Sequence, residues 1–503
     1  MSTAHVFVGQ CGNQLGTAFL DTLAQEADES QSEEYQLLVS STHFRPALKR
    51  PKVPAKRTAG AALSGTSVSR ELPQPRCVMI DMEPKVIDQM VTRRNGSAGD
   101  GEAAALYNLA PQQCVMQGSG SANNWAYGYL QQGAKSRDAI EEALRREGEA
   151  AAASISTYHV VHSVAGGTGS GVSCLVAEVV KDLFPTATLL HTVVWPFDCG
   201  EVVTQWFNTV LCMASLRDSV DGVFVAFNED VADQLRGRYA TVGLPQKAEV
   251  HFDAMNHRIS RLLTPLHLPA LLYAVPPPYK AVSANTLGRG DGEAPLPEPL
   301  RFARSEDLVE ALTLDPATKF FTGALVPKLP TGTTRWSAVV EEVARRAQQA
   351  FTAPSVFHTQ SGLSPYGMNS PHTCLWTLRG YESRTTGMRE LQRRMTAADR
   401  FPLSALLVSP LTASRPSPSG ADQEVTLYGP SPRIGAGLQR ALERTEELLH
   451  VGAFAHHFEQ YGVGKHELLD CTAKLWDTVA AYTPRGGVRS GGANAPGGCA
   501  KRV

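Results

Sequence analysis

Short apolar runs alternate with stretches of helical spacing along the first half of the chain. The runs at residues 77–80, 158–164 and 223–227 have the length and continuity of buried strands. Residues 172–183 instead carry apolar side chains at intervals of three and four, which is the spacing of a helix that buries one face. Strands that alternate with helices predict an α/β fold with a parallel, Rossmann-like sheet.

Three turns rich in glycine or other small residues each lie between an expected strand and an expected helix, at residues 9–14, 117–125 and 165–171. Such a turn leaves backbone N–H groups unpaired at the positive end of a helix, and glycine lets a ligand approach closely. In a parallel sheet these turns lie at one edge, so we expect them to meet. Their convergence predicts nucleotide binding, although any one of them alone is also explained as an ordinary turn.

Two carboxylates follow the expected strand at 77–80. Asp81 and Glu83 come at its end, directly before Pro84. Oxygen ligands beside a phosphate site suit Mg²⁺, which commonly keeps water molecules between itself and the protein. The alternative is a pair of solvated acids at a strand end.

Side chains that suit ribose and guanine follow later in the chain. Glu201 and Gln205 are placed to accept hydrogen bonds from ribose hydroxyls, and Asn228 and Asn256 can both donate to and accept from a base. Phe252 offers a ring that can stack on guanine. Taken singly, each of these residues is also explained as an ordinary surface residue.

Composition narrows the classes of function. The 503 residues are 43% apolar and 19% charged, which is typical of a globular chain of several folding units. The net charge of −2 argues against a nucleic-acid binder that works through bulk charge. The nine cysteines include no C-x-x-C pair, which disfavours a zinc knuckle or a disulfide framework. No leader or membrane span is evident, so we expect an intracellular protein that does not bind a membrane.

The second half of the chain is patterned as a second domain followed by helices. Apolar stretches at 320–326, 373–378 and 403–408 indicate a mixed α/β domain. Ser431 and Pro432 are typical of a helix start, and apolar residues from 434 to 449 follow at helical spacing, with a further helix through 468–479.

Four motifs together resemble the tubulin family in order and approximate spacing. They are Gly9-Gln10-Cys11-Gly12-Asn13-Gln14, Asp81-Met82-Glu83-Pro84, Asn123-Asn124-Trp125-Ala126 and Gly166-Gly167-Thr168-Gly169-Ser170-Gly171. The resemblance spans nearly the whole chain. Within the family the sequence is most similar to the delta subfamily, on the strength of residues 81–87, 123–129, 195–196 and 200–203.

The resemblance implies a tubulin-like division of the chain. Its parts are a nucleotide-binding domain at 1–262 with an insertion at about 40–75, an intermediate α/β domain at 263–430 with an insertion at about 276–300, a C-terminal helical pair at 431–483, and a basic, glycine-rich tail at 484–503. We expect the stretch at 414–420 to be another loop.

The resemblance also implies GTP or GDP as the ligand, with Mg²⁺ near Asp81 and Glu83. The residues implied to hold the phosphates are Gln10, Cys11, Ala122, Asn123, Ser163, Gly166, Gly167, Thr168 and Gly169. Ribose is implied near Glu201 and Gln205, and guanine near Asn228, Phe252 and Asn256. Ala122 and Ala165 stand where many tubulins have glycine, and Gln205 stands where glutamate is usual.

Any GTPase activity implied by the resemblance is weak in the isolated chain. In polymerising tubulins an acidic residue completes the GTP site of the next subunit. Asp307 is the expected acid here, with Glu306 as the alternative. Its expected role is to orient a water molecule towards the γ-phosphate. A solvated acid at a helix start is the other interpretation of this position.

For a delta-like tubulin, the resemblance implies a cytoskeletal role at centrioles and basal bodies, where triplet microtubules support cilia and flagella. The implied partners are other tubulins, including epsilon-tubulin or alpha- and beta-tubulin at microtubule ends. The tail at 484–503 has four basic residues and no acidic one, unlike the acidic tails of lattice tubulins. The alternatives are another specialised tubulin, a microtubule lattice subunit, or a free-standing nucleotide-dependent enzyme.

Overall fold

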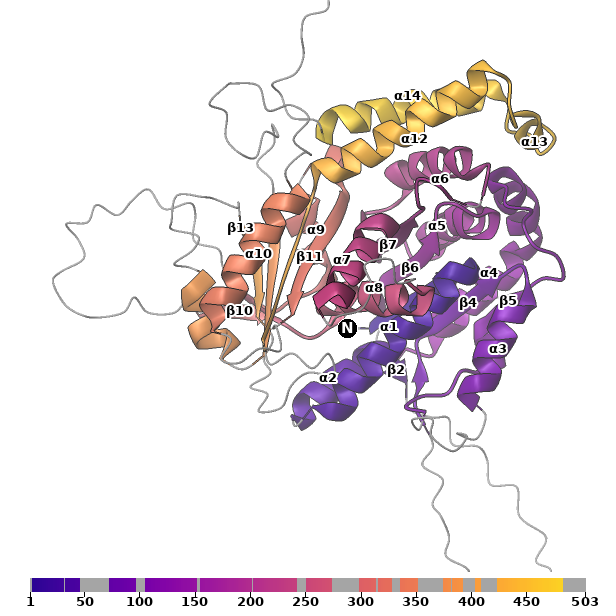
Figure 1. Ribbon diagram of the computed structural model, residues 1–503. Coiled ribbons are helices and arrows are strands. Elements are labelled where there is room, and N and C mark those ends of the chain that lie inside the picture. The colour runs from indigo at the N-terminus through magenta and orange to yellow at the C-terminus, as the bar shows by residue number, and fades with distance from the viewer. Residues whose placement is uncertain are drawn as a thin grey trace, which may run out of the picture.

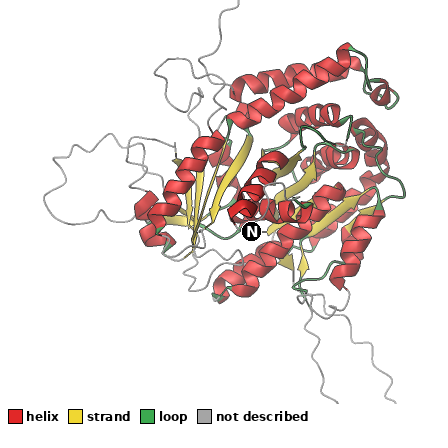
Figure 2. Ribbon diagram, viewed as in Figure 1, coloured by secondary structure: helices red, strands yellow, loops and turns green. Residues whose placement is uncertain are grey.

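The computed structural model describes residues 2–30, 32–45, 72–95, 105–151, 154–200, 202–241, 250–273, 298–313, 315–327, 335–351, 374–380, 382–391, 403–408 and 423–482. Within these ranges, helices cover both faces of a large sheet (Figures 1 and 2). The α/β architecture that the apolar pattern predicts is confirmed.

The first half of the chain forms the parallel part of a twelve-stranded sheet. Its strands are β1 (Ser2–Val8), β4 (Cys77–Asp81), β5 (Cys114–Met116), β6 (Ile155–Ser163), β7 (Thr188–Trp195) and β8 (Gly222–Phe227). They lie in the order β8-β7-β6-β1-β4-β5, and every neighbouring pair is parallel. Every residue of β1, β4, β7 and β8 is buried, which explains the continuous apolar runs of β4 and β8.

The second half continues the same sheet. Its strands are β9 (Leu271–Tyr273), β10 (Pro299–Phe302), β11 (Phe320–Pro327), β12 (Cys374–Gly380), β13 (Leu403–Val408) and β14 (Gln423–Gly429). β11 joins the two halves, because it pairs in parallel with β8 and antiparallel with β14. Beyond β14 the order is β12-β13-β9-β10, with both parallel and antiparallel pairs. The sheet in this half therefore contains both parallel and antiparallel pairs.

One face of the sheet is covered by α4 (Ala134–Glu149), α5 (Ser173–Leu183) and α6 (Gln205–Ser219), with α12 (Pro432–His450) and α14 (Lys465–Tyr482) packed over α6 (Figure 1). The short α13 (His456–Glu459) connects the last two. Phe207, Leu438 and Leu475 belong to the core on this side. The Tyr482 hydroxyl donates to Phe320 O at 2.6 Å, which ties the end of α14 to β11.

The other face carries α1 (Gly9–Glu29), α2 (Glu33–His43), α3 (Pro84–Asn95), α7 (Asn228–Thr241) and α8 (Phe252–His267). Beside the second half of the sheet lie α9 (Ser305–Leu312) and α10 (Trp336–Phe351). The sequence interpretation missed α8, although Met255, Ile259, Leu262 and Leu266 are buried at helical spacing.

The regular elements extend into both predicted insertions. α2, β2 (Phe44–Arg45) and β3 (Gln74–Pro75) occupy the ends of the segment 40–75, and β10 begins within 276–300. Val203 precedes α6 and is exposed. Residues 46–71, 274–297, 414–420 and 484–503 lie outside the described residues.

Candidate nucleotide site

The first and third small-residue turns meet at the edge where β1, β4 and β6 end. Val8, the last residue of β1, is paired with Ile80 of β4 and His162 of β6, so the turns that follow begin side by side. Gly9 has a φ of +75°, and a methyl group added there would lie 3.0 Å from the backbone nitrogen of Gly169. The two turns therefore touch through glycine, where no side chain fits.

The second turn closes on the third. A methyl group added at Gly167, in the third turn, would lie 2.6 Å from the backbone nitrogen of Asn124, in the second turn. The backbones of the two turns are therefore in direct contact at Gly167. At Gly166 the nearest atom to an added methyl group is Asn123 Oδ1, at 3.8 Å. Gly166 thus has space beside it that the described residues do not fill.

One buried side chain, Asn208 of α6, holds these two turns together. Its Nδ2 donates to Asn123 O at 2.8 Å and to Ala165 O at 2.7 Å, while its Oδ1 accepts from Trp125 N at 2.8 Å. The sequence interpretation missed Asn208. Its partners lie 43 and more positions away in the chain, so no local signal could have found it.

Hydroxyl groups add further links within the turns. Ser121 Oγ and Thr168 Oγ1 lie 2.8 Å apart. Ser163 Oγ accepts from Ala165 N at 3.2 Å, and Ser170 Oγ donates to Gly166 O. Ser163 and Thr168, both predicted to hold phosphates, therefore also shape the loops.

The backbone of the second turn has an unusual conformation. Ala122 and Asn123 have φ values of +49° and +50°, in the left-handed region that glycine adopts more readily than alanine. Both side chains are exposed. This conformation gives a physical reason for glycine at the position of Ala122 in the tubulin pattern.

Asp81 has an unused acceptor at this edge. It is buried, and its Oδ2 has no hydrogen-bond partner among the described residues, while its Oδ1 accepts from Glu83 N at 3.3 Å. Burial raises the pKa of Asp81 to about 6. Gly120 lies against Glu83 so closely that a methyl group at Gly120 would collide with Oε1. An orphaned carboxylate oxygen beside a second acid fits a divalent cation.

These two acids do not form a complete metal site by themselves. The described residues contain no group of three or more His, Cys, Asp or Glu that could hold a metal ion. This donor set suits Mg²⁺, because that ion is usually bound through one or two carboxylates together with phosphate oxygens and water.

Polar residues at the start of α1 differ in role. Gln10 is exposed at the edge. Cys11 is half-buried, and burial raises the pKa of its thiol to about 12, so it remains protonated at neutral pH. Asn13 also carries an amide that could donate to phosphate, but its Nδ2 donates instead to Gly9 O at 2.9 Å and to Ile80 O at 3.0 Å. Asn13 therefore ties α1 to β4.

On the predicted ribose side, Gln205 is buried at the start of α6. Its Nε2 donates to Phe197 O at 3.0 Å, which closes the loop between β7 and α6. A side chain at Gly200 would collide with Gln205 Oε1, so the loop is packed on this amide. Glu201, the other predicted ribose contact, lies outside the described residues.

On the predicted base side, two helices begin at the residues expected to contact guanine. Asn228 is the first residue of α7, and Phe252 is the first residue of α8, with Asn256 one turn further on. Phe252 is 64% exposed, so its ring is free to stack on a ligand, whereas Asn256 is 8% exposed. β8, which precedes Asn228, pairs with β7 through Phe227 and Trp195. The start of α7 therefore lies beside the loop between β7 and α6.

The expected catalytic acid has a structural role at the start of α9. Asp307 accepts from Arg304 N and from Arg301 Nη1, each at 2.6 Å, and its second oxygen pairs with Arg301 Nη2. It therefore caps the helix and fixes β10 beside it. Glu306 is exposed.

α9 lies near the opposite edge of the sheet from the glycine turns. A cavity of about 360 Å³ is lined by Arg304 and Ser305, at the start of α9, and by Thr3 and Ser156, at the starts of β1 and β6. β1 has seven residues, so about 20 Å separates this edge from the edge that carries Gly9. An acid of α9 is thus remote from the turns of its own chain.

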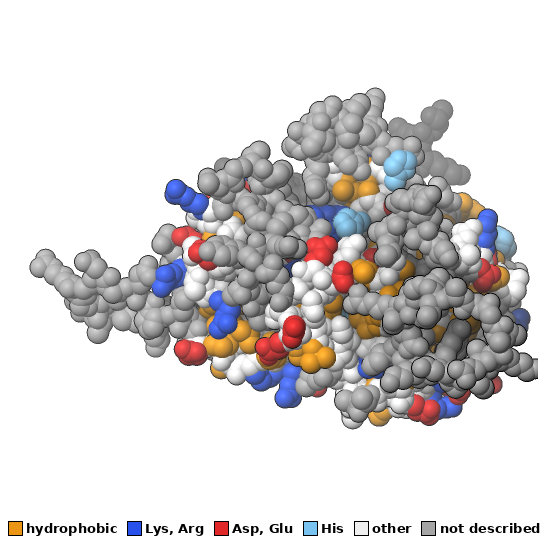
Figure 3. All heavy atoms as spheres, turned by 90° about the horizontal axis from the view of Figure 1, so that it is seen from below, with side chains coloured by type: hydrophobic (Ala, Val, Ile, Leu, Met, Phe, Trp, Pro, Cys, Tyr) orange, Lys and Arg blue, Asp and Glu red, His pale blue; other side chains and the backbone are white. Residues whose placement is uncertain are grey.

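On the face in Figure 3, basic and acidic side chains are interspersed among apolar ones. Among the described residues, no helix has both the length and the apolar character needed to cross a bilayer.

Comparison with known proteins gives a family match in the region of these turns. Residues 2–236 match the model for the GTPase domain of the Tubulin/FtsZ family. The tubulin delta chain of Macaca fascicularis is 31% identical over 238 residues, which is 46% of each chain. The tubulin epsilon chain of Mus musculus is 30% identical over 282 residues, 52% of this chain and 55% of the relative. The match thus spans about half the length of these relatives.

A longer match, at lower sequence identity, covers both halves of the sheet. The tubulin beta-1 chain of Colletotrichum graminicola is 26% identical over 492 residues, which is 95% of this chain and 93% of the relative.

Proposed function

This chain carries a GTPase domain of the Tubulin/FtsZ family, with delta-like similarity, and from that premise we propose that it is a guanine-nucleotide-dependent assembly protein. GTP or GDP binds at the edge formed by the three turns. The observation that supports this most directly is the contact of the turn at Gly9 with Gly169 and of Asn123 with the open side of Gly166. Backbone N–H groups at two helix starts there suit phosphate.

The proposed roles of the surrounding residues follow from their chemistry. Gln10 and Asn123 are exposed amides that can donate to phosphate oxygens, and Asp81 and Glu83 would hold Mg²⁺ together with those oxygens. Bound Mg²⁺ supplies charge neutralisation at the phosphates. Asn228, Asn256 and Phe252 are proposed for the base, and Gln205 with Glu201 for the ribose.

Hydrolysis, where it occurs, is proposed to need a neighbouring chain. Asp307 and Glu306 lie near the edge opposite the turns, so they can serve only the nucleotide of another subunit. Of the two, Glu306 has the freer carboxylate, because that of Asp307 is held by Arg301. The proposed partners are therefore other tubulins, stacked edge to edge.

The delta-like similarity favours a role in the assembly or maintenance of centriole and basal-body triplet microtubules, and hence of cilia and flagella, in the cytoskeleton. A microtubule lattice subunit is the second candidate, since the likeness to a beta-1 chain extends over 95% of this chain.

The test uses the space beside Gly166. An alanine there meets no described protein atom closer than 3.8 Å, so Gly166→Ala should fold normally yet place a methyl group where the phosphate is proposed to lie. We expect the affinity of the purified chain for GDP to fall about tenfold, equivalent to ~1.4 kcal/mol. Isothermal titration calorimetry measures this, after nucleotide extracted from the wild type has been identified by chromatography.

Gly237→Ala is the matched control, because Gly237 lies within α7, outside the three turns, and an added methyl group there has nothing within 4 Å. It should leave affinity unchanged. Extraction of an adenine or nicotinamide nucleotide would instead favour a free-standing enzyme. Equal GDP affinities of the two variants would contradict the proposed phosphate position.

A further inference from the structure

Two arginines of α12 reach the loop that follows β7 and the first turn of α7, which follows β8 directly. Arg433 and Arg440 are seven residues apart and so lie on one face of the helix. Arg440 Nη1 pairs with Asp198 Oδ2 at 2.7 Å. Arg433 Nη2 pairs with Asp230 Oδ1 at 3.2 Å and lies 3.6 Å from Glu229 Oε2.

Asp198 is held twice. Its carboxylate pairs with Arg440, and its backbone N–H donates to Glu229 Oε1 at 3.2 Å. Because Glu229 in turn faces Arg433, both arginines lead to the same loop residue. The loop between β7 and α6 is therefore positioned from the side of α12.

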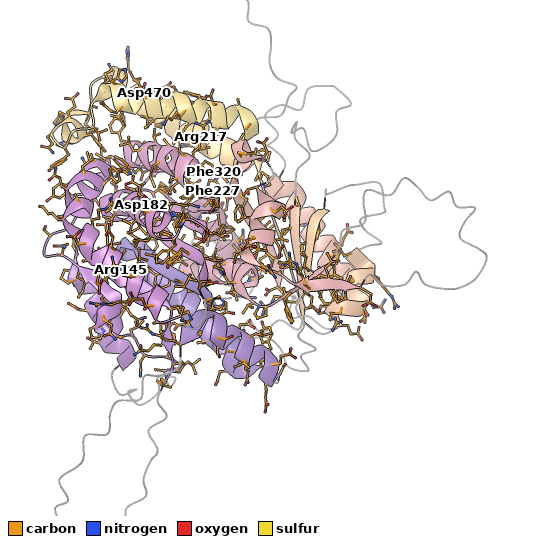
Figure 4. The ribbon with its side chains drawn as sticks, turned by 180° about the vertical axis from the view of Figure 1, so that it is seen from behind. Arg145, Asp182, Arg217, Phe227, Phe320 and Asp470 are labelled. Atoms are coloured by element: carbon orange, nitrogen blue, oxygen red, sulfur yellow. The ribbon has the colours of Figure 1, made fainter. Side chains whose placement is uncertain are left out.

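α12 packs closely against the end of β8 beside these ion pairs. The guanidinium of Arg433 lies 4.7 Å from the centre of the Phe227 ring. Between the arginines, a methyl group added at Gly437 would lie 3.0 Å from that ring. Phe227, the last residue of β8, lies on the side of the sheet that the C-terminal helices cover (Figure 4).

The C-terminal segment also touches the phosphate side. Asn124 Nδ2 donates to His457 O at 2.8 Å, and the rings of Tyr127 and Tyr461 lie 4.7 Å apart. Asn124 directly follows Asn123, whose amide is proposed to contact phosphate. α12 and the α13 region thus contact the candidate site from two directions.

We propose that α12 is a positioning element of the nucleotide site. In this proposal Arg440 and Arg433 hold the loop between β7 and α6, and the start of α7, in the conformation that retains nucleotide. This inference rests on the proposed function. It extends that function by making nucleotide affinity depend on where the C-terminal helices sit. By linkage, a partner that binds the outer surface of α12 and α14 and shifts α12 changes nucleotide affinity, and nucleotide changes the affinity for that partner equally.

A purely stabilising role predicts a different outcome from a positioning role. The side chains of Arg440 and Asp198 are 50% and 26% exposed, and an ion pair of such exposure contributes little to stability. Loss of Arg440 should therefore leave the unfolding temperature almost unchanged while it frees the loop.

The experiment measures release of a fluorescent GDP analogue, N-methylanthraniloyl-GDP, from the full-length chain by stopped flow. We expect Arg440→Ala to release it roughly two- to fivefold faster than the wild type. Arg444→Ala is the matched control, because Arg444 lies on the same helix, is 53% exposed and pairs only with Glu447 of that helix among the described residues. The control should release nucleotide at the wild-type rate.

Reversal of the pair, Arg440→Asp with Asp198→Arg, should restore slow release. Equal rates for Arg440→Ala and Arg444→Ala, in a wild type that binds nucleotide, would overturn this inference alone. A wild-type chain that binds no guanine nucleotide would overturn the proposed function and this inference with it.

Discussion

At the scale of single residues, the candidate site combines exposed side chains that are proposed to bind nucleotide with buried side chains whose hydrogen bonds shape the loops. Asn13 and Asn208 have the chemistry of ligand-binding amides, yet their hydrogen bonds go to the backbone of β4 and of the two turns. Gln10 and Asn123 remain exposed. The difference depends on burial, which the residue type alone does not indicate.

Ala122 gives the prediction at this scale. Its φ of +49° strains an alanine by about 1–2 kcal/mol, whereas glycine adopts the conformation freely but loses more entropy on folding. We expect Ala122→Gly to raise the free energy of unfolding by about 0.5–1 kcal/mol, measured by urea denaturation. Ala150→Gly is the control, because its φ of −75° is ordinary, and it should lower stability. A loss of stability in both variants would show that the left-handed conformation is not strained.

At the scale of elements, four buried charges join the two halves of the sheet. Arg379 of β12 pairs with Glu26 of α1 at 2.7 Å and with Glu424 of β14 at 3.2 Å, and Arg261 of α8 also pairs with Glu424 at 3.2 Å. Burial by itself lowers the pKa of Arg379, but the attraction of Glu26 and Glu424 raises it overall, so it stays charged.

We expect Arg379→Met to destabilise the chain by about 3–5 kcal/mol, because it leaves Glu26 without the cation at 2.7 Å and Glu424 with one cation fewer. Arg345→Met removes an exposed pair with Glu342 on α10 and should cost less than about 1 kcal/mol. Urea denaturation of both variants measures the difference. Similar losses in the two variants would mean that the buried charges contribute no more than a surface pair.

The elements of the parallel half were predictable because their strands are buried on both faces and their turns contain glycine. α8 was missed for the opposite reason. Its inner face includes Arg258 and Arg261, which are buried against Leu325 O and Glu424, so the apolar stripe is interrupted. The capping of α9 by Asp307 also depends on Arg301, in a strand that the sequence pattern did not indicate.

At the scale of the whole molecule, histidines from several elements meet in the core. His5 Nδ1 lies 3.2 Å from His159 Nδ1, and His5 Nε2 lies 3.1 Å from His43 Nδ1. A second pair joins His162 to His191 at 2.9 Å. Burial lowers the pKa of His43 and of His162 to about 4 and that of His159 to about 3.

Stability should therefore fall as the pH falls below about 6.5. The unfolded chain binds protons on these imidazoles in that range, whereas the folded chain does not, so acid favours unfolding. Relative to pH 7.5, each of His43, His159 and His162 lowers the free energy of unfolding by about 1.4 kcal/mol at pH 5.5, or by roughly 4 kcal/mol together. Urea denaturation between pH 7.5 and 5.5 measures this.

His466→Gln is the control for that series. His466 lies on the surface with its side chain 86% exposed, so its removal should leave the pH dependence almost unchanged. Constant or rising stability as the solution is acidified would show that the core imidazoles are protonated in the folded chain.

The glycine turns and α9 are separated by the length of β1, so the folded molecule has two unlike surfaces at opposite edges of its sheet. Molecules that use both surfaces can join only head to tail, and such a row has a direction. If the acid on α9 acts on the nucleotide of the adjacent molecule, the row always ends in one member whose nucleotide has no such neighbour. In such a row, the terminal member would keep its GTP longest. The number of molecules with unhydrolysed GTP at that end would then depend on how recently molecules were added.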